Sequence, residues 1–421
     1  HFMRCNRIII LLIFLPILIH AQNVFNGIAE YPFIDTSKNK LIFPNSQTTT
    51  LDDFFSKMDS LIFTGEGNIN IIHMGGSHVQ ADVFSNKIRE NLMQFYPSIV
   101  GSRGLIFPYK IAKTNNPKNY YVSYGGEWSY SRNVNKYIEY SLGASGISVA
   151  TQDTSAYLSI KLQPTDANIR YSSTIITLLG HSENNSMEPL IVIDDTTAYT
   201  GTYDSVHFCY RFELDNPTDE VMIQFLTNDS IIKPFVLRGI IWEPDQAGIS
   251  YHSIGVNGAS TISYLKCELL ENDIELLKPD LIIFAIGIND AAGTNFSKEE
   301  FINNYSTLID KIKAVAPNVS FIFVTNNDSY KRYKKRYYVN KNGLIAREAF
   351  YELANKYNGA VWDLFDIMGG LSSMKQWESV GLAQHDKIHF TAIGYNLIGD
   401  LFYNALISEY LKYISENSKI L

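Results

Sequence analysis

Residues 69–77 read INIIHMGGS, an apolar run that ends in two glycines and a serine. The next apolar residues recur at helical spacing, at Val79, Val83, Phe84, Ile88 and Leu92. A buried strand that leads through a glycine turn into a helix is the repeating unit of a parallel α/β sheet. We therefore expect Ser77 at the carboxyl edge of such a sheet, where open α/β folds bind their ligands.

The same alternation of strand and helix returns after Gly248. Apolar runs predict strands over residues 281–286 and 319–325, and helical spacing predicts helices over residues 298–314 and 391–413. Alternation of this kind indicates a parallel sheet flanked by helices.

The middle of the chain has a different pattern. From about Tyr120 to Pro244, short β-rich runs such as residues 156–160 and 190–193 are separated by turns rich in Asn, Asp, Ser and Gly. This pattern predicts a β-sandwich inserted into the α/β domain. The predicted organisation is one α/β domain made from residues 22–118 and 246–421, with the β-sandwich over residues 119–245.

The N-terminal segment predicts export. Arg4 and Arg7 precede an apolar run over residues 8–19, and His20-Ala21-Gln22 follow, which is typical of a signal peptide over residues 1–21. This run is too short to span a bilayer comfortably, and no comparable run follows it. We expect a periplasmic or extracellular protein without stable membrane insertion after cleavage, and an uncleaved anchor is the alternative.

The charge balance is acidic. The chain has 35 Lys and Arg against 43 Asp and Glu, a formal net charge of −8, which becomes −10 when residues 1–21 and their two arginines are removed. Nucleic acid is therefore not an expected partner. We expect the basic run at residues 331–336 to be a solvated helix face, with an anionic glycan or a membrane surface as the alternative. The spacing of Cys209 and Cys267 does not indicate whether they pair.

Two distant segments together suggest nucleophilic catalysis. Ser77 is expected at the start of a helix, whose first N–H groups and positive dipole end favour an oxyanion. Asp386 precedes His389 by three residues in a polar loop, and such a pair can hold the imidazole in the tautomer that accepts a serine proton. Taken singly, a helix-capping serine and a bland surface loop are the alternatives.

Two loops that follow predicted strands could supply hydrogen bonds to a tetrahedral intermediate. The backbone N–H groups of Ser77 and Gly258 and the side-chain amide of Asn289 would make a three-donor oxyanion hole. A glycine turn at Gly258 and a helix cap at Asn289 or Asp290 are the alternatives, and Gly255 is a rival to Gly258.

In their order along the chain, these segments resemble the SGNH (GDSL-like) hydrolases, which are named after a serine, a glycine, an asparagine and a histidine from four sequence blocks. The residues that match those blocks are Ser77, Gly258, Asn289 and His389. The segment from Asp386 to Tyr395 also resembles the family's loop into its final helix. The first block departs from the pattern, because Gly76 stands where the family usually has an aspartate that braces the site.

The resemblance implies a three-layer α/β fold of the SGNH type and a serine esterase that needs no cofactor or metal. Ser77 would be the nucleophile, His389 the general base and Asp386 the residue that orients it. The insert resembles that of the bacterial peptidoglycan O-acetylesterases, in which a carbohydrate-binding-like sandwich interrupts the hydrolase domain. The implied substrate is an acetylated glycan or peptidoglycan. A glycan O-acyltransferase, a lipase or lysophospholipase, and a non-catalytic carbohydrate-binding protein are the alternatives.

Other histidines and the aromatic residues of the insert are expected to be structural. We place His73 near the core, expect His78 to shape the pocket, and expect that His385 could compete for Asp386. A metal site made from these residues and His389 is not expected, since no ligand pair has a recognised spacing. The early aromatic residues of the insert are expected in its core, with stacking on sugar rings as the alternative: Tyr120, Tyr121, Tyr124, Trp128 and Tyr130.

Overall fold

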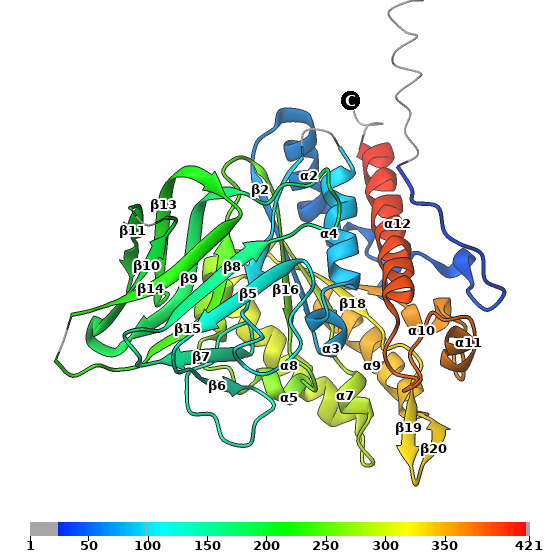
Figure 1. Ribbon diagram of the computed structural model, residues 1–421. Helices are drawn as coiled ribbons and strands as arrows, with labels where there is room; N and C mark the ends of the chain where they lie inside the picture. Colours follow the sequence, from blue (N-terminus) through cyan, green and yellow to red (C-terminus); the bar gives the residue numbers. More distant parts are fainter. Residues whose placement is uncertain (1–23, 97–98, 195, 229, 418–421) are drawn as a thin grey trace, which may run out of the picture.

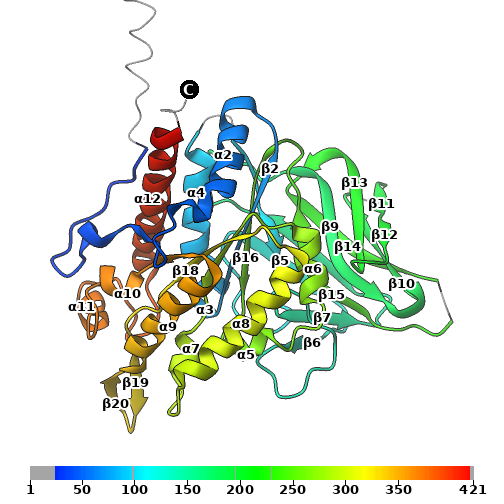
Figure 2. The same cartoon turned by 180° about the vertical axis from the view of Figure 1, so that it is seen from behind.

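The computed structural model describes residues 24–96, 99–194, 196–228 and 230–417, so the predicted signal peptide lies outside the described residues. An α/β part and an antiparallel β part lie side by side in Figures 1 and 2. Among the described helices, none is both long enough and apolar enough to cross a membrane. Cys209 and Cys267 are both buried and both free.

The α/β part is built on a seven-stranded sheet with the order β1-β21-β18-β17-β2-β16-β3. All neighbouring strands are parallel except β1, which is antiparallel to β21. The strands are β1 (Leu41–Ile42), β2 (Asn68–Gly75), β3 (Val100–Ser102), β16 (Gly248–Gly255), β17 (Leu281–Ala285), β18 (Ser320–Val324) and β21 (Ala360–Trp362). The predicted parallel α/β fold is confirmed.

Helices cover both faces of this sheet (Figures 1 and 2). One face carries α2 (Asp52–Thr64), α4 (Phe84–Gln94) and α12 (Ala392–Asn417), and the other carries α6 (Leu270–Leu277), α8 (Lys298–Val315) and α9 (Asn342–Tyr357). Successive strand residues alternate between the two cores: Ile71 and Ile283 pack on the first side, whereas Ile72 and Phe284 pack on the second. Burial on both faces explains why these strands read as continuous apolar runs.

Short helices connect the larger elements. They are α3 (Ser77–Gln80), α5 (Thr261–Tyr264), α7 (Ile288–Ala291), α10 (Leu364–Ile367) and α11 (Met374–Ser379), with 3₁₀ turns η1 (Thr36–Lys38), η2 (Thr48–Leu51) and η3 (Glu183–Asn185).

The antiparallel part consists of two sheets that pack face to face. One contains β5 (Tyr120–Gly125), β8 (Tyr157–Leu162), β10 (Met187–Val192), β11 (Ala198–Thr200) and β14 (Glu220–Thr227). The other contains β4 (Gly104–Ile106), β6 (Ser129–Arg132), β7 (Ile147–Thr151), β9 (Ser173–Ser182), β12 (Thr202–Asp204), β13 (Cys209–Thr218) and β15 (Phe235–Trp242). Leu158 and Ile160 from the first sheet join Ile176 and Leu178 from the second in one buried core. Strand β4 lies upstream of the predicted boundary at residue 119 and pairs with β15.

Two sequence-based expectations about local structure are wrong. The basic run at residues 331–336 is not a helix face but part of a hairpin, β19 (Tyr330–Tyr333) and β20 (Arg336–Val339). The tyrosines and the valine of this segment favour strands, and this preference decides its secondary structure, whereas the charged residues had been interpreted as a helix face. The helical pattern after Ser77 is also interrupted, because Asp82 adopts a left-handed conformation with φ of 47° between α3 and α4.

Asp82 is the centre of a buried polar network. Its carboxylate accepts hydrogen bonds from Arg89 (3.0 Å), Asn119 (2.7 Å) and Ser253 (2.7 Å), and it also pairs with Arg103. Burial alone would raise the pKa of Asp82, but the charges of the two arginines outweigh burial and hold the pKa well below its usual range. The network joins α4, β16 and the first residues of the sandwich.

Replacing Asp82 by Asn should destabilise the fold strongly. Arg89 and Arg103, 0% and 1% exposed, would be left buried without a countercharge. Loss of one partner of a buried ion pair costs about 3–5 kcal/mol in free energy of unfolding, measurable by urea denaturation. The control Asp219→Asn, at an exposed site, should stay within about 0.5 kcal/mol of the parent. Equal stability of the two variants would contradict this role of Asp82.

Candidate active site

Ser77 lies at the carboxyl edge of the parallel sheet, as the first residue of α3. Gly76 is the N-cap residue of that helix, so Ser77 does not cap it. Two glycines that face each other on β2 and β16, Gly75 and Gly255, let the helix begin directly at the sheet edge. A Cβ at position 255 would lie 2.7 Å from the carbonyl oxygen of Gly76, closer than packed atoms allow.

A chain of hydrogen bonds joins Ser77 to the loop ahead of α12. The Oγ of Ser77 lies 2.8 Å from Nε2 of His389, and Nδ1 of His389 lies 2.7 Å from Oδ2 of Asp386. The other carboxylate oxygen of Asp386 accepts the backbone N–H groups of Ile388 (2.9 Å) and His389 (3.0 Å). The three side chains that the sequence singled out are therefore in contact.

The protonation state of Asp386 decides the tautomer of His389. Partial burial raises the pKa of Asp386, but the hydrogen bonds from the His389 ring and from the two backbone N–H groups outweigh burial and lower the pKa to about 2. Asp386 is thus ionised near neutral pH and can only accept a hydrogen bond. Nδ1 of His389 then carries the proton, and Nε2 presents its lone pair to the Ser77 hydroxyl.

The three expected oxyanion donors follow strands that end at the same edge of the sheet. As the first residue of a helix, Ser77 has a backbone N–H without an intrahelical acceptor. Gly258 lies in an exposed turn with φ of 83°, and its N–H has no acceptor within the described part of the chain. The amide of Asn289 donates one hydrogen to the carbonyl of Ala259 (2.8 Å), which leaves its second hydrogen available. A Cβ at position 76 would lie 3.2 Å from that amide nitrogen.

Sequence reasoning missed two residues that hold this loop in place. Gln80 accepts the N–H of Asn257 (2.6 Å) and donates to the carbonyl of Asn115 (2.8 Å), which ties α3 to the turn of Gly258. Asp290 does not cap its own helix but accepts the backbone N–H of Thr261 (3.1 Å). Neither residue carries a local signal, because each acts on a segment far along the chain.

The other histidines have separate roles. His73 is fully buried and bonds to Tyr251 (2.8 Å). His78 bonds to the hydroxyl of Tyr395 (2.7 Å), and burial lowers its pKa to about 3, so it is neutral beside His389. His385 bonds to Glu378 (2.8 Å) rather than competing for Asp386. Within the described ranges, no group of three or more His, Cys, Asp or Glu side chains is placed to hold a metal ion.

Known proteins resemble part of this chain in sequence and most of it in fold. Residues 242–397 match the GDSL-like Lipase/Acylhydrolase family, a range that contains Gly258, Asn289, Asp386 and His389 but not Ser77. This match covers the second segment of the α/β domain, which therefore resembles the GDSL-like hydrolases in sequence. The match supports carboxylic ester hydrolase activity. None of the curated proteins matches the chain.

One solved structure shares the fold of most of this chain, and others match a smaller part of it. A peptidoglycan O-acetylesterase is 17% identical with a TM-score of 0.71, and the match covers 88% of this chain and 99% of that chain, a share large enough that the match must extend into the inserted sandwich. The acetyl xylan esterase AlAXEase is 20% identical over 38% of this chain and 82% of that chain, with a TM-score of 0.31. A lipase/acylhydrolase from Enterococcus faecalis is 22% identical over 39% and 77%, with a TM-score of 0.30.

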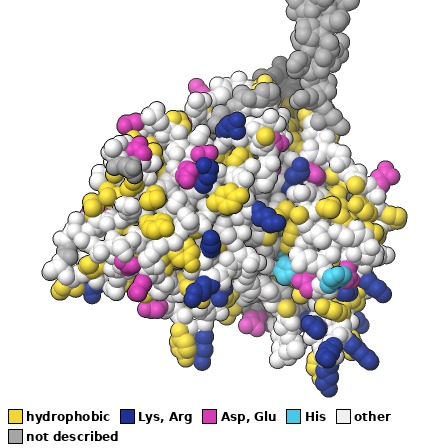
Figure 3. Space-filling view, viewed as in Figure 1, with side chains coloured by type: hydrophobic (Ala, Val, Ile, Leu, Met, Phe, Trp, Pro, Cys, Tyr) yellow, Lys and Arg dark blue, Asp and Glu magenta, His cyan; other side chains and the backbone are white. Residues whose placement is uncertain are grey.

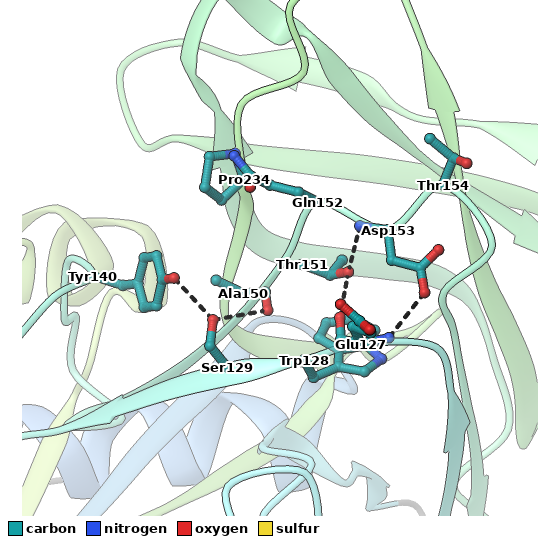
Figure 4. Close-up of a pocket in the computed structure, with 10 residues that line it drawn as sticks. All are labelled: Glu127, Trp128, Ser129, Tyr140, Ala150, Thr151, Gln152, Asp153, Thr154 and Pro234. Atoms are coloured by element: carbon teal, nitrogen blue, oxygen red, sulfur yellow. Dashed lines mark hydrogen bonds between the residues drawn. The ribbon is translucent and has the colours of Figure 1, made fainter.

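The aromatic residues of the insert divide between core and surface. Tyr120 is buried, whereas Tyr121 is 61% exposed. Trp128 lines an open cavity of about 660 Å³ in the sandwich, together with Glu127, Tyr140 and Asp153 (Figure 4). Much of the polar lining is already satisfied, since Asp153 accepts the N–H of Glu127 (2.9 Å) and the indole N–H of Trp128 donates to a backbone carbonyl. This cavity is separate from the Ser77 site.

A side chain at position 76 should slow turnover, because it would press on the Asn289 amide. A methyl group in Gly76→Ala would press on the Asn289 amide from 3.2 Å and turn it from its position. Since removal of one oxyanion donor costs about 10²–10³ in turnover, this displacement should lower kcat on p-nitrophenyl acetate by at least about 10-fold. The control Gly27→Ala, at a site with no atom within 4 Å of the new methyl group, should keep the parent kcat. An unchanged kcat in Gly76→Ala would contradict a role of the Asn289 amide in the reaction.

Proposed function

We propose that this protein is an exported serine esterase that removes O-acyl groups, most simply O-acetyl groups, from a glycan. The hydrogen-bond chain from Ser77 through His389 to Asp386, beside three available N–H donors, is the observation that carries this proposal. It supplies a nucleophile, a base, an orienting carboxylate and an anion site at one sheet edge.

In the proposed reaction, Nε2 of His389 takes the hydroxyl proton of Ser77 as Oγ attacks the ester carbonyl. The developing oxyanion accepts hydrogen bonds from the N–H groups of Ser77 and Gly258 and from the Asn289 amide. His389 then gives its proton to the leaving sugar oxygen, and the acyl group remains on Ser77. Water repeats the sequence and releases the carboxylic acid. Asp386 stays ionised throughout and stabilises the imidazolium form of His389.

The glycan substrate is supported by the fold shared with a peptidoglycan O-acetylesterase, sandwich included, and by the exposed aromatic residues of the insert. Export is supported by the pattern of residues 1–21, which suits a protein that acts on an extracellular polymer.

Acetate release from p-nitrophenyl acetate and from an acetylated glycan tests this proposal. Ser77→Ala and His389→Ala should each lower kcat by at least about 10⁴-fold, because either change removes the activated nucleophile. His385→Ala is the matched control, since its side chain is fully exposed and does not touch Asp386, and it should keep the parent rate. A chelator should have no effect, because no metal takes part in these steps.

Three outcomes would contradict the proposal. An inert parent that still binds glycan after Ser77→Ala would favour a non-catalytic binding protein. An active Ser77→Ala variant would mean that another group is the nucleophile. Transfer of acetyl to an added glycan acceptor, at the expense of hydrolysis, would make the protein an O-acyltransferase that uses the same residues.

A further inference from the structure

A strongly cationic element stands beside the Ser77 site. We define the cationic hairpin as residues 330–339, which comprise β19, β20 and their turn. It has no Asp or Glu, in a chain of net charge −8, and its cations are Lys331, Arg332, Lys334, Lys335 and Arg336. In Figure 3, dark blue side chains gather at the lower end of the molecule, where Figure 1 places β19 and β20.

These five cations are not neutralised by their surroundings. None of them forms an ion pair with a described residue. The acidic residues of the adjoining segments do not neutralise them: Asp386 bonds to His389, Glu378 pairs with Lys387 and His385, and Asp328 is buried and accepts the N–H of Met374 (3.0 Å). Lys331 is half-buried and donates to the carbonyl of Gly293 (2.9 Å), whereas the other four cations are exposed, so most of the positive charge of the hairpin faces solvent.

The base of the hairpin is attached to both sides of the active site. The N–H of Tyr330 donates to the carbonyl of Lys387 (3.1 Å), and Nζ of Lys387 lies 4.4 Å from the centre of the Tyr337 ring. These contacts join the hairpin to the loop of the catalytic histidine. Asn340, which follows β20, donates to the carbonyl of Ala291 (3.1 Å), the last residue of α7, which carries the oxyanion asparagine.

Exposed tyrosines accompany the cations. Tyr333 is 61% exposed and lies opposite Arg336, and Tyr338 is 50% exposed and lies opposite Lys331. Directly opposed side chains of an antiparallel pair share one face, so each pair presents a ring next to a cation. A ring can cover the face of a sugar, and a cation can bind a carboxylate or phosphate.

Two lysines occupy the turn, although their backbone conformation is unfavourable for them. Lys334 and Lys335 have φ of 44° and 67° at the two central positions of the hairpin turn. A turn of this kind needs the left-handed region at both positions and favours Asn and Gly. This unfavourable turn has two positive charges at the tip of the hairpin, roughly 13 Å beyond its base.

We propose that the cationic hairpin binds the acidic groups of the polymer whose ester lies at Ser77, so that the substrate is an acidic, O-acylated polysaccharide. This inference rests on the proposed function and names its substrate class. An anionic membrane fits the surface less well, because residues 330–339 contain no Trp, Phe or Leu that would enter the acyl boundary. The position beside the ester-cleaving residues favours the substrate itself as the occupant.

The variant Lys334→Asn with Lys335→Gly removes two charges and supplies the residues that the turn prefers, so the hairpin should still form. The measured quantity is the ratio of kcat/KM on acidic O-acetylated polygalacturonate to that on neutral O-acetylated glucomannan. For two exposed cations, this ratio should fall about 2- to 30-fold, and the loss should shrink in high salt. A ratio equal to that of the parent would overturn the proposal.

The matched control is Lys278→Asn with Lys313→Gln. Both lysines are exposed and form no ion pair with a described residue. They precede β17 and β18, at the opposite edge of the sheet from Ser77. The backbone of Lys278 is also in the left-handed conformation. The control should keep the parent ratio, and an equal loss in it would show that only the overall charge matters and would overturn the proposal.

Binding measurements separate this inference from the proposed function. The Ser77→Ala chain should bind polygalacturonate, and the two hairpin substitutions should weaken that binding even if no polymer is hydrolysed. Absence of acetate release would then contradict only the proposed function. Hairpin-dependent binding to phosphatidylglycerol vesicles, with no binding to polygalacturonate, would assign the hairpin to a membrane and overturn the inference.

Discussion

The hydrogen bond between Oγ of Ser77 and Nε2 of His389 joins two residues that are 312 positions apart in the chain. Such a contact, 2.8 Å long, needs both ends of the α/β domain to return to one edge of the sheet. β2 delivers Ser77 and the loop ahead of α12 delivers His389, while β16 and β17 lie on either side of β2 and place Gly258 and Asn289 next to it. The parallel register of these strands is what brings the groups together.

The insert must leave and rejoin the α/β domain without disturbing that register. β16 follows the sandwich directly and pairs with β2 along its whole length. The buried carboxylate of Asp82 holds this junction, since it binds Ser253 of β16 and Asn119 at the start of the sandwich. A structural ion cluster and the proposed catalytic site thus lie at the two ends of the short segment from Ser77 to Asp82.

Much of this architecture could be predicted from local sequence. Strands β2 and β17 are buried on both faces, so their apolar runs could be recognised as strands. Asp386 and His389 lie only three residues apart, so their pairing could also be predicted from the sequence. The break at Asp82 could not be predicted, because its carboxylate binds Arg103, Asn119 and Ser253, which lie elsewhere in the chain. Gln80 was missed for the same reason.

The secondary structure of the cationic hairpin was predicted wrongly for a different reason. Its turn has lysines where the usual signal is Asn or Gly, so the run of charges was interpreted as a solvated helix face and the hairpin was missed. Only the folded chain shows that these charges stand beside the loop that carries Asp386 and His389.

The central claim is that Ser77 becomes acylated, and mass spectrometry of the acid-quenched enzyme after mixing with p-nitrophenyl acetate tests it most directly. We expect one acetyl group on the proteolytic fragment that contains Ser77, formed within the first turnover and lost as hydrolysis proceeds. An acetyl group on another residue, or turnover without any acylated fragment at early times, would contradict the account.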